Sequence, residues 1–270
     1  MGMSESSGML RRHVLAPSEI AWNYPPKGFL LKKRALDILI SVAVCVLLLW
    51  WLLPILAILI KLDSKGPVFF VQQRVGLFGN KFGCIKLRTM IMNEDADHLQ
   101  ASNNDPRITR IGKFLRLSCL DELPQFINVL RGEMSIVGPR PHMITDCREF
   151  IKVVPTYNFR HSVKPGITGV AQIKGLRGKT ESVQDVILRY QWDCFYVLNA
   201  TVKMDFELIY KTISQVVGTV IGSNAANGKK KEASIYQLPS VPSIYSNQVL
   251  SDVQSTTSTD RLTRHVGTKV

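Results

Sequence analysis

The sequence has few acidic residues and few cysteines for its length. Only 21 Asp and Glu residues oppose 34 Lys and Arg residues in a chain of 270, so the net charge is +13. Such an excess indicates a polyanionic partner, namely nucleic acid, anionic lipid or a phosphorylated substrate. The five cysteines are scattered, odd in number and never spaced C-x-x-C. This pattern argues against a zinc site and a disulfide framework, and it indicates a reducing, cytosolic setting.

Several common functional motifs are also missing. No glycine-rich stretch matches G-x-x-x-x-G-K-[ST] or G-x-G-x-x-G, and "KPGITGVAQIKG" (164–175) fits neither phosphate-binding pattern. The five histidines show no ligand spacing, and the nucleophile elbow of a serine hydrolase is absent. Aromatic residues are not interleaved with the basic ones, so we expect no nucleic-acid partner.

The chain does contain one long hydrophobic run, from Ile38 to Ile60, and its 23 residues are long enough to cross a bilayer. Basic residues lie on both sides of the run, at 27–34 and at Lys61 and Lys65. A spanning helix would instead gather Lys and Arg at its cytoplasmic end. Pro54 inside the run favours a kink. We therefore expect a re-entrant helix that enters and leaves the membrane on one face, in preference to a simple span.

Composition divides the chain into four predicted segments. These are a disordered N-terminal segment (1–30), a membrane-inserted re-entrant helix (31–62), a cytoplasmic domain (63–221) and a disordered polar and basic tail (222–270). For the domain we expect an α+β fold in which helices surround a β-hairpin, formed within 66–90 by two β-prone runs around "GLFGNK". Helices are predicted at Leu120–Leu130, Ser182–Leu198 and Met204–Val217, and the polar stretch 91–104 is compatible with another.

The stretch "CLDELPQF" (119–126) places Asp121 and Glu122 side by side among apolar residues. Neighbours on a helix point about 100° apart, so two such carboxylates cannot hold one small ion symmetrically. They can serve two tasks at one site, one attacking and the other holding a metal. At a helix start the dipole would favour anions and keep Asp121 ionised. The alternative interpretation is that both are ordinary first-turn acids that satisfy the dipole.

Basic residues suggest what the two acids act on. Lys86 and Arg88 lie two residues apart in "IKLRTM", so a strand would project both from one face. Four more crowd "DPRITRIGKFLR", among them Arg116, and Arg140 lies in the rigid segment "GPRP". Arginine binds phosphate oxygens through paired donors, so the set favours a polyphosphate site. Any one of them alone is more often a solvated surface charge.

From about Lys32 to Val217 the chain resembles the bacterial sugar transferases, which are monotopic phosphoglycosyl transferases acting on polyprenyl phosphate. The matching segments occur in the family's order and are "KRALDI", "IKLDSKGPVFFVQQRVG", "FGCIKLRTM", "NDPRITRIGKFLR", "LDELPQFINVLRGEMSIVGPRP" and "KPGITGVAQIKG". The fifth segment is highly specific to that family.

The resemblance implies a reaction in which a sugar 1-phosphate passes from a nucleoside diphosphate sugar to polyprenyl (undecaprenyl) phosphate. A nucleoside monophosphate is released, and a covalent aspartyl-phosphosugar intermediate is formed. The stretches "LRGKTES" and "DCFYVLN" favour a UDP-hexose donor of the glucose or galactose type, in the first membrane step of exopolysaccharide synthesis. The family also implies a bacterial inner-membrane location, contact with membrane lipids and a catalytic domain on the cytoplasmic face. A homo-oligomer is compatible with it.

By motif match, the resemblance makes Asp121 the nucleophile and Glu122 the residue that supports Mg²⁺, the implied cofactor. Phosphate-binding roles fall on Lys86, Arg88, Arg116 and Arg140, and places near the nucleotide fall on Thr168 and Gln172.

The chain departs from the family pattern at two positions, since Leu53 and Cys119 stand where Ser is more usual. Asp193 and Tyr196 match a further family signature, "DCFYVLN", to which the sequence assigns no role. The alternative function is that of a non-catalytic, membrane-anchored adaptor that only binds a nucleotide sugar. The intact Asp121–Glu122 pair argues against that alternative.

Overall fold

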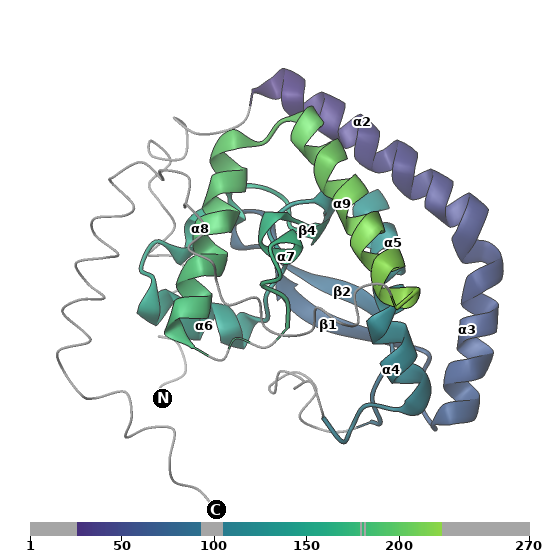
Figure 1. The fold of residues 1–270 in the computed structure, drawn as a ribbon. Helices are drawn as coiled ribbons and strands as arrows, with labels where there is room; N and C mark the ends of the chain where they lie inside the picture. Colours follow the sequence, from purple (N-terminus) through teal and green to yellow (C-terminus); the bar gives the residue numbers. More distant parts are fainter. Residues whose placement is uncertain (1–25, 93–104, 179, 181, 223–270) are drawn as a thin grey trace, which may run out of the picture. The chain divides into compact units, whose positions relative to one another are not determined.

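The computed structural model describes residues 26–92, 105–178, 180 and 182–222. All of them belong to the first of two units into which the chain divides, Met1–Glu232, and the second unit, Ala233–Val270, lies outside them. The disorder predicted at 1–30 and 222–270 and the helix considered at 91–104 therefore fall almost entirely outside the described residues. Within these residues the fold is α+β and mostly helical, as expected (Figure 1).

The described part begins with a continuous helical stretch that is slightly longer than the predicted 31–62. It comprises α2 (Lys27–Val44), the π-helical turn η1 (Cys45–Leu49) and α3 (Trp50–Asp63). By length and composition this stretch could cross a membrane. It changes direction where α2 passes through η1 into α3 (Figure 1). The expected irregularity at Pro54 thus lies in the turn that precedes it, and both proline and π-helical turns are established causes of kinks.

The predicted β-hairpin is confirmed. Strands β1 (Phe69–Val75) and β2 (Lys81–Leu87) pair antiparallel, from Phe69 opposite Leu87 to Val75 opposite Lys81. The 3₁₀ turn η2 (Leu77–Gly79) joins them, and Gly79 has a φ of 79°. Glycine adopts this left-handed conformation without a steric penalty, which explains why the loop "GLFGN" reverses the chain.

A second, parallel pair of strands was not predicted. Strand β3 (Ser135–Val137) lies beside β4 (Gly166–Thr168), and the chain between them forms α6 (Ile144–Val153) and the 3₁₀ helix η5 (Tyr157–Ser162). Strands of three residues are too short to show an alternating pattern, so periodicity could not reveal them.

The two helices predicted near the C-terminal end of the domain are confirmed as α8 (Val183–Asn199) and α9 (Val202–Val220), after the short helix α7 (Val170–Ile173). Ser182 and Asp185 form a reciprocal capping box at the start of α8. The Thr201 side chain accepts a hydrogen bond from the Met204 amide at the start of α9. Such caps satisfy amides that have no partner within the helix.

The single helix predicted over Leu120–Leu130 is wrong in its first half. After α4 (Arg110–Leu117) the chain forms the 3₁₀ turn η4 (Leu120–Glu122), and α5 begins only at Gln125 and ends at Leu130. Pro124, which cannot donate a backbone hydrogen bond, stands immediately before α5. The two acids therefore lie in a separate turn in front of the helix.

Both limbs of the bent helix pack on the same domain. On the α3 side, Leu56 and Ile60 form a buried cluster with Leu87 of β2 and Leu115 of α4. On the α2 side, the Arg34 guanidinium donates to two carbonyl oxygens at the end of α5, at 2.7 Å and 3.0 Å. The apolar segment is therefore attached to the domain at each end.

Candidate active site

Asp121 and Glu122 are presented by a strained turn. Cys119 stands in the left-handed conformation at φ 56° and ψ 17°, which is unusual for a residue other than glycine. The Glu122 amide donates to the Cys119 carbonyl at 3.2 Å and so closes η4. This reversal between α4 and α5 places the two adjacent carboxylates in different surroundings.

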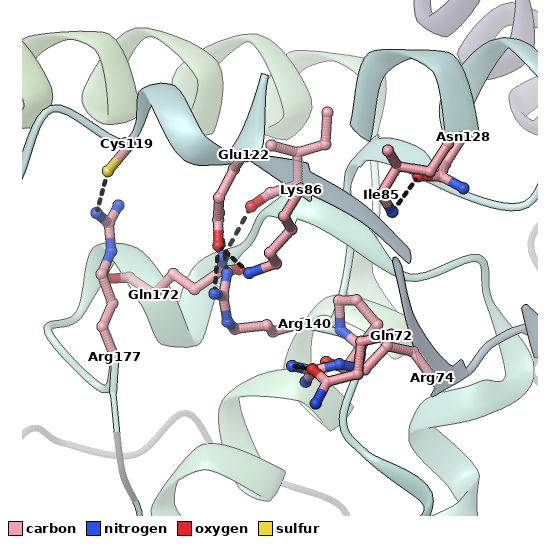
Figure 2. A network of polar contacts seen from close by, with 12 residues as sticks. Gln72, Arg74, Ile85, Lys86, Cys119, Glu122, Asn128, Arg140, Gln172 and Arg177 are labelled. Carbon is pink, nitrogen blue, oxygen red and sulfur yellow. Dashed lines mark hydrogen bonds and ion pairs between the residues drawn. The ribbon is translucent and has the colours of Figure 1, made fainter. Parts of the chain in front are cut away.

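Glu122 is held by two cations from distant parts of the chain (Figure 2). Lys86 Nζ in β2 lies 2.7 Å from Glu122 Oε1, and the Arg140 guanidinium grips both carboxylate oxygens, at 2.5 Å and 3.2 Å. Burial alone would raise the pKa of Glu122, but Arg140 and Lys86 outweigh it and hold the pKa well below its ordinary value. Glu122 is therefore a permanent anion in a bidentate ion pair.

The pKa of Asp121 is shifted in the opposite direction. Its side chain is buried, at 8% exposure, and burial together with the neighbouring charge of Glu122 raises its pKa to about 6. Lys86, Arg116 and Arg140 oppose this shift but do not cancel it. A helix dipole is not what keeps Asp121 ionised, because α5 starts beyond the pair. Two acids pushed apart in pKa are typical of sites in which they have separate tasks.

The backbone at Arg140 is held by two arginines that were not predicted from the sequence. Arg160 donates to the Arg140 carbonyl at 2.5 Å and also pairs with Asp193, with both side chains almost fully buried. Arg74 donates to the Pro141 carbonyl at 2.9 Å. Asp193 thus acquires a structural role, and the signature "DCFYVLN" was the only signal for it. No local pattern distinguishes Arg74 or Arg160 from a surface arginine.

The segment "GPRP" also packs tightly against the parallel strands. The Gly138 amide donates to the Thr168 carbonyl at 2.9 Å, and a Cβ added at Gly138 would lie 2.4 Å from the Lys164 carbonyl. Thr168 is itself buried, and its hydroxyl lies 2.6 Å from that of Thr212 in α9. In the structure, Thr168 therefore stabilises the segment "GPRP" through its backbone carbonyl.

The side chain of Gln172, in α7, points toward Glu122 and Arg140 (Figure 2). Its amide nitrogen donates to the Ile167 carbonyl at 2.8 Å, whereas its buried Oε1 has no hydrogen-bond partner in the described part of the chain. Arg177 donates to the Gln172 carbonyl at 3.2 Å and reaches the Cys119 sulfur at 3.9 Å. Gln172 therefore offers a free acceptor next to the ion pair.

The other two predicted phosphate ligands, Arg116 and Arg88, have different surroundings. Arg116 in α4 is near enough to Asp121 to lower its pKa. Arg88 lies one residue beyond β2 and donates to the carbonyl oxygens of Ser64, at 2.7 Å, and Lys65, just after α3. Unlike Lys86, it thus secures the end of the apolar helix in this structure, and no hydrogen bond joins it to the acidic pair.

The carboxylates suit one kind of metal site better than others. No group of three or more His, Cys, Asp or Glu residues gathers anywhere in the described ranges. Mg²⁺ is commonly held by one or two carboxylates together with substrate phosphates, and Asp121 and Glu122 fit that donor set. Both oxygens of Glu122 are already paired with cations, so a metal there would have to share this carboxylate with Lys86 and Arg140.

Comparison with known proteins decides the family. Residues 29–219 match the family model described as bacterial sugar transferase. The chain belongs to the bacterial sugar transferase family. It is 40% identical over 226 residues to a UDP-glucose:undecaprenyl-phosphate glucose-1-phosphate transferase of Caulobacter vibrioides, covering 80% of this chain and 84% of that protein.

Two further relatives of this sugar transferase are longer proteins. An Escherichia coli protein of the same name is 44% identical over 184 residues, which is 68% of this chain but 39% of the relative. An Aeromonas hydrophila UDP-N-acetylgalactosamine-undecaprenyl-phosphate N-acetylgalactosaminephosphotransferase is 36% identical over 212 residues, or 78% of this chain and 49% of the relative. The chain thus spans less than half of these two relatives, and their named sugars differ.

Proposed function

We propose that this sugar transferase moves a hexose 1-phosphate from a UDP-sugar, with UDP-glucose the leading candidate, to undecaprenyl phosphate. The observation that carries the proposal is the opposite environment of the two adjacent acids. Glu122 is held as an anion by Lys86 and Arg140. Asp121 makes no ion pair within the described residues, and burial together with the charge of Glu122 raises its pKa to about 6. Three of the similar proteins considered above carry names for this class of transfer.

In the first step, an Asp121 carboxylate oxygen attacks the phosphorus that bears the sugar. The bond between that phosphorus and the bridging oxygen of the diphosphate breaks, and UMP leaves with the bridging oxygen and its electron pair. A covalent aspartyl phosphosugar remains on the enzyme. Asp121 must be deprotonated for this step, and a pKa of about 6 leaves it ionised yet more basic than an ordinary aspartate.

In the second step, a phosphate oxygen of undecaprenyl phosphate attacks the same phosphorus and releases the Asp121 carboxylate. Negative charge gathers on the phosphoryl oxygens in both steps, so neighbouring cations are needed. Arg140 and Lys86 lie at Glu122, and Arg116 is close to Asp121. The unpaired Gln172 Oε1 would accept a hydrogen bond from the donor substrate.

Mg²⁺ is part of the proposal, with Glu122 as its protein ligand. The ion would neutralise charge on the diphosphate without any proton transfer to the phosphates. The protein groups keep their own tasks: Arg140 orients Glu122, and Lys86 shares that carboxylate. Arg88 remains a predicted phosphate ligand, and the hydrogen bonds it makes here favour a structural role instead.

The membrane attachment is proposed to be re-entrant, from the cytoplasmic face of the inner membrane. Its support is that α2 and α3 both contact the same domain, which a straight span could not do. The outer side of the bent helix exposes a broad apolar surface, and α9 exposes a second apolar row at helical spacing. The exposed residues are Leu39, Val46, Leu47, Trp50, Ile58 and Leu62 on the bent helix, and Phe206, Tyr210, Ile213 and Val217 on α9.

The test is to incubate the detergent-solubilised full chain with Mg²⁺, undecaprenyl phosphate and a panel of UDP-sugars, and to measure UMP release. We expect release with one or a few hexoses, dependent on the lipid and abolished by Asp121→Asn. Binding of UDP-sugars without release of UMP from any of them would reject the transferase and favour the non-catalytic adaptor.

A further inference from the structure

A buried polar contact links the membrane helix α2 to strand β3. Asp37 is only 3% exposed, and its Oδ1 accepts hydrogen bonds from the Ser135 hydroxyl and from the Ile136 amide, both at 3.0 Å. A carboxylate buried on an apolar helix costs free energy unless it is hydrogen-bonded, and here both bonds go to one strand. Asp37 therefore ties the helix to β3 at a defined position.

A second link runs from α2 to the other end of the same strand. Lys33, one helical turn before Asp37, lies 2.7 Å from Asp205 of α9. The Tyr196 hydroxyl is 2.7 Å from Asp205 and 3.1 Å from the Val137 carbonyl. These side chains are all buried, so Asp205 and Tyr196 link α2 indirectly to the Val137 end of β3.

Strand β3 leads without a break into the segment that carries Arg140. Three backbone groups of this segment are hydrogen-bonded: the Gly138 amide donates to the Thr168 carbonyl, the Pro139 carbonyl accepts from the Gly166 amide, and the Arg140 carbonyl accepts from Arg160. Because only two residues separate β3 from Arg140, a displacement of β3 would also shift the Arg140 backbone, and its guanidinium with it. That guanidinium grips Glu122 at 2.5 Å.

We propose that Asp37 is a positioning residue. It fixes β3 relative to α2, and through β3 it fixes Arg140 relative to Glu122, so the position of α2 affects the site. The inference rests on the proposed function, because Arg140 acts on phosphates only in that reaction. It makes the transfer depend on the fit of α2 in the membrane, since a tilt of the helix moves Asp37 and the strand together. Misplacement by about 1 Å can lower a rate about 100-fold.

The test uses the first half-reaction, measured as exchange of labelled UMP into UDP-glucose without lipid acceptor. Asp37→Ala should slow exchange about 10- to 100-fold, and Asp37→Asn, which keeps an acceptor oxygen, should restore most of the rate. Ser41→Ala is the matched control. Ser41 is fully buried one turn further along α2, and its hydroxyl has no hydrogen-bond partner among the described residues, so exchange should be unchanged.

A double-mutant cycle separates positioning from general loss of structure. If Asp37 acts through Arg140, then Asp37→Ala in an Arg140→Lys background should cost little beyond Arg140→Lys alone. Losses that multiply would overturn the inference, as would a wild-type rate in Asp37→Ala. Thermal unfolding of each variant shows whether a lower rate merely reflects a smaller folded fraction.

Hydrogen exchange gives a readout that does not need activity. Amides at 135–140 should exchange faster in Asp37→Ala than in Ser41→Ala, and equal protection in the two variants would overturn the inference. If the wild-type protein failed to exchange UMP with any UDP-sugar, the proposed function would fall. The protection of 135–140 would still show whether Asp37 fixes this strand.

Discussion

At the scale of single residues, the pair Asp121–Glu122 is held at a cost to the fold. Asp121 has a raised pKa in the folded protein, so the folded state binds its proton more tightly than the unfolded state does. The stability that comes from this proton is complete below the unfolded pKa, near 4, and is lost as the pH rises through about 6. At neutral pH the ionised carboxylate therefore destabilises the protein.

Replacement of Asp121 by Asn should accordingly stabilise the protein while it abolishes transfer. We expect the free energy of unfolding at pH 8 to rise by about 2 kcal/mol, and the gain to shrink below pH 6 as the wild-type carboxyl becomes protonated. Denaturant titration in detergent at both pH values measures this difference. A variant less stable than wild type at pH 8 would mean that Asp121 makes a favourable charged contact.

The rate of the first half-reaction should follow the ionisation of Asp121. We expect kcat/KM to fall below a pH of about 6, where the nucleophile is protonated, and to reach a plateau above it. In Glu122→Gln the acidic limb should move to lower pH, because the neighbouring negative charge that helps to raise the pKa is gone. A profile that stays flat down to about pH 4.5 would contradict Asp121 as the titrating nucleophile.

Lys86 and Arg88 belong to one motif, "IKLRTM", and variants of each show whether the two residues have the same role. Lys86→Met should reduce UMP release about 100-fold with little loss of stability, because Lys86 contacts Glu122. Arg88→Met should instead lower the free energy of unfolding by about 2–3 kcal/mol, because carbonyl oxygens beyond α3 lose a charged donor. Unchanged unfolding of Arg88→Met together with a higher KM for UDP-sugar would restore Arg88 as a phosphate ligand.

At the scale of elements, the bent helix decides how the domain meets the membrane. Lys27 and Lys65 lie at its two ends, and both are exposed. Single-cysteine variants at these positions, in a background without the five native cysteines, should react equally poorly with an impermeant maleimide added to intact cells. Both should react after permeabilisation. Labelling of one site alone in intact cells would mean a true span.

Local sequence patterns predicted the elements that have a strong local signal. The hairpin follows from two β-prone runs around glycines, and α8 and α9 follow from long periodic stretches with Ser182 and Thr201 as caps. The turn η4 was missed because a helical pattern continues through it. The left-handed Cys119 separates the acids from α4, and Pro124 stands between them and α5. Strands β3 and β4 were missed because their pairing depends on residues about 30 positions apart.

At the scale of the whole molecule, the site is made of contacts that no local pattern contains. The motif match selected Asp121, Glu122, Lys86 and Arg140, and the structure brings Glu122, Lys86 and Arg140 together beside Asp121. The sequence could not show that Arg88 binds carbonyl oxygens just after the apolar helix. Nor could it show that Arg160 and Arg74 bind the adjacent carbonyl oxygens of Arg140 and Pro141. Such roles depend on which distant carbonyl a guanidinium reaches after folding.

The proposed covalent phosphosugar on Asp121 can be detected in the mass of the intact protein. Full-length protein mixed with Mg²⁺ and UDP-glucose, without lipid acceptor, should gain the mass of one hexose phosphate, and the gain should disappear when undecaprenyl phosphate is added. Asp121→Asn should never gain it. Steady release of UMP by an Asp121→Asn protein, or an adduct that maps to another residue, would contradict the account.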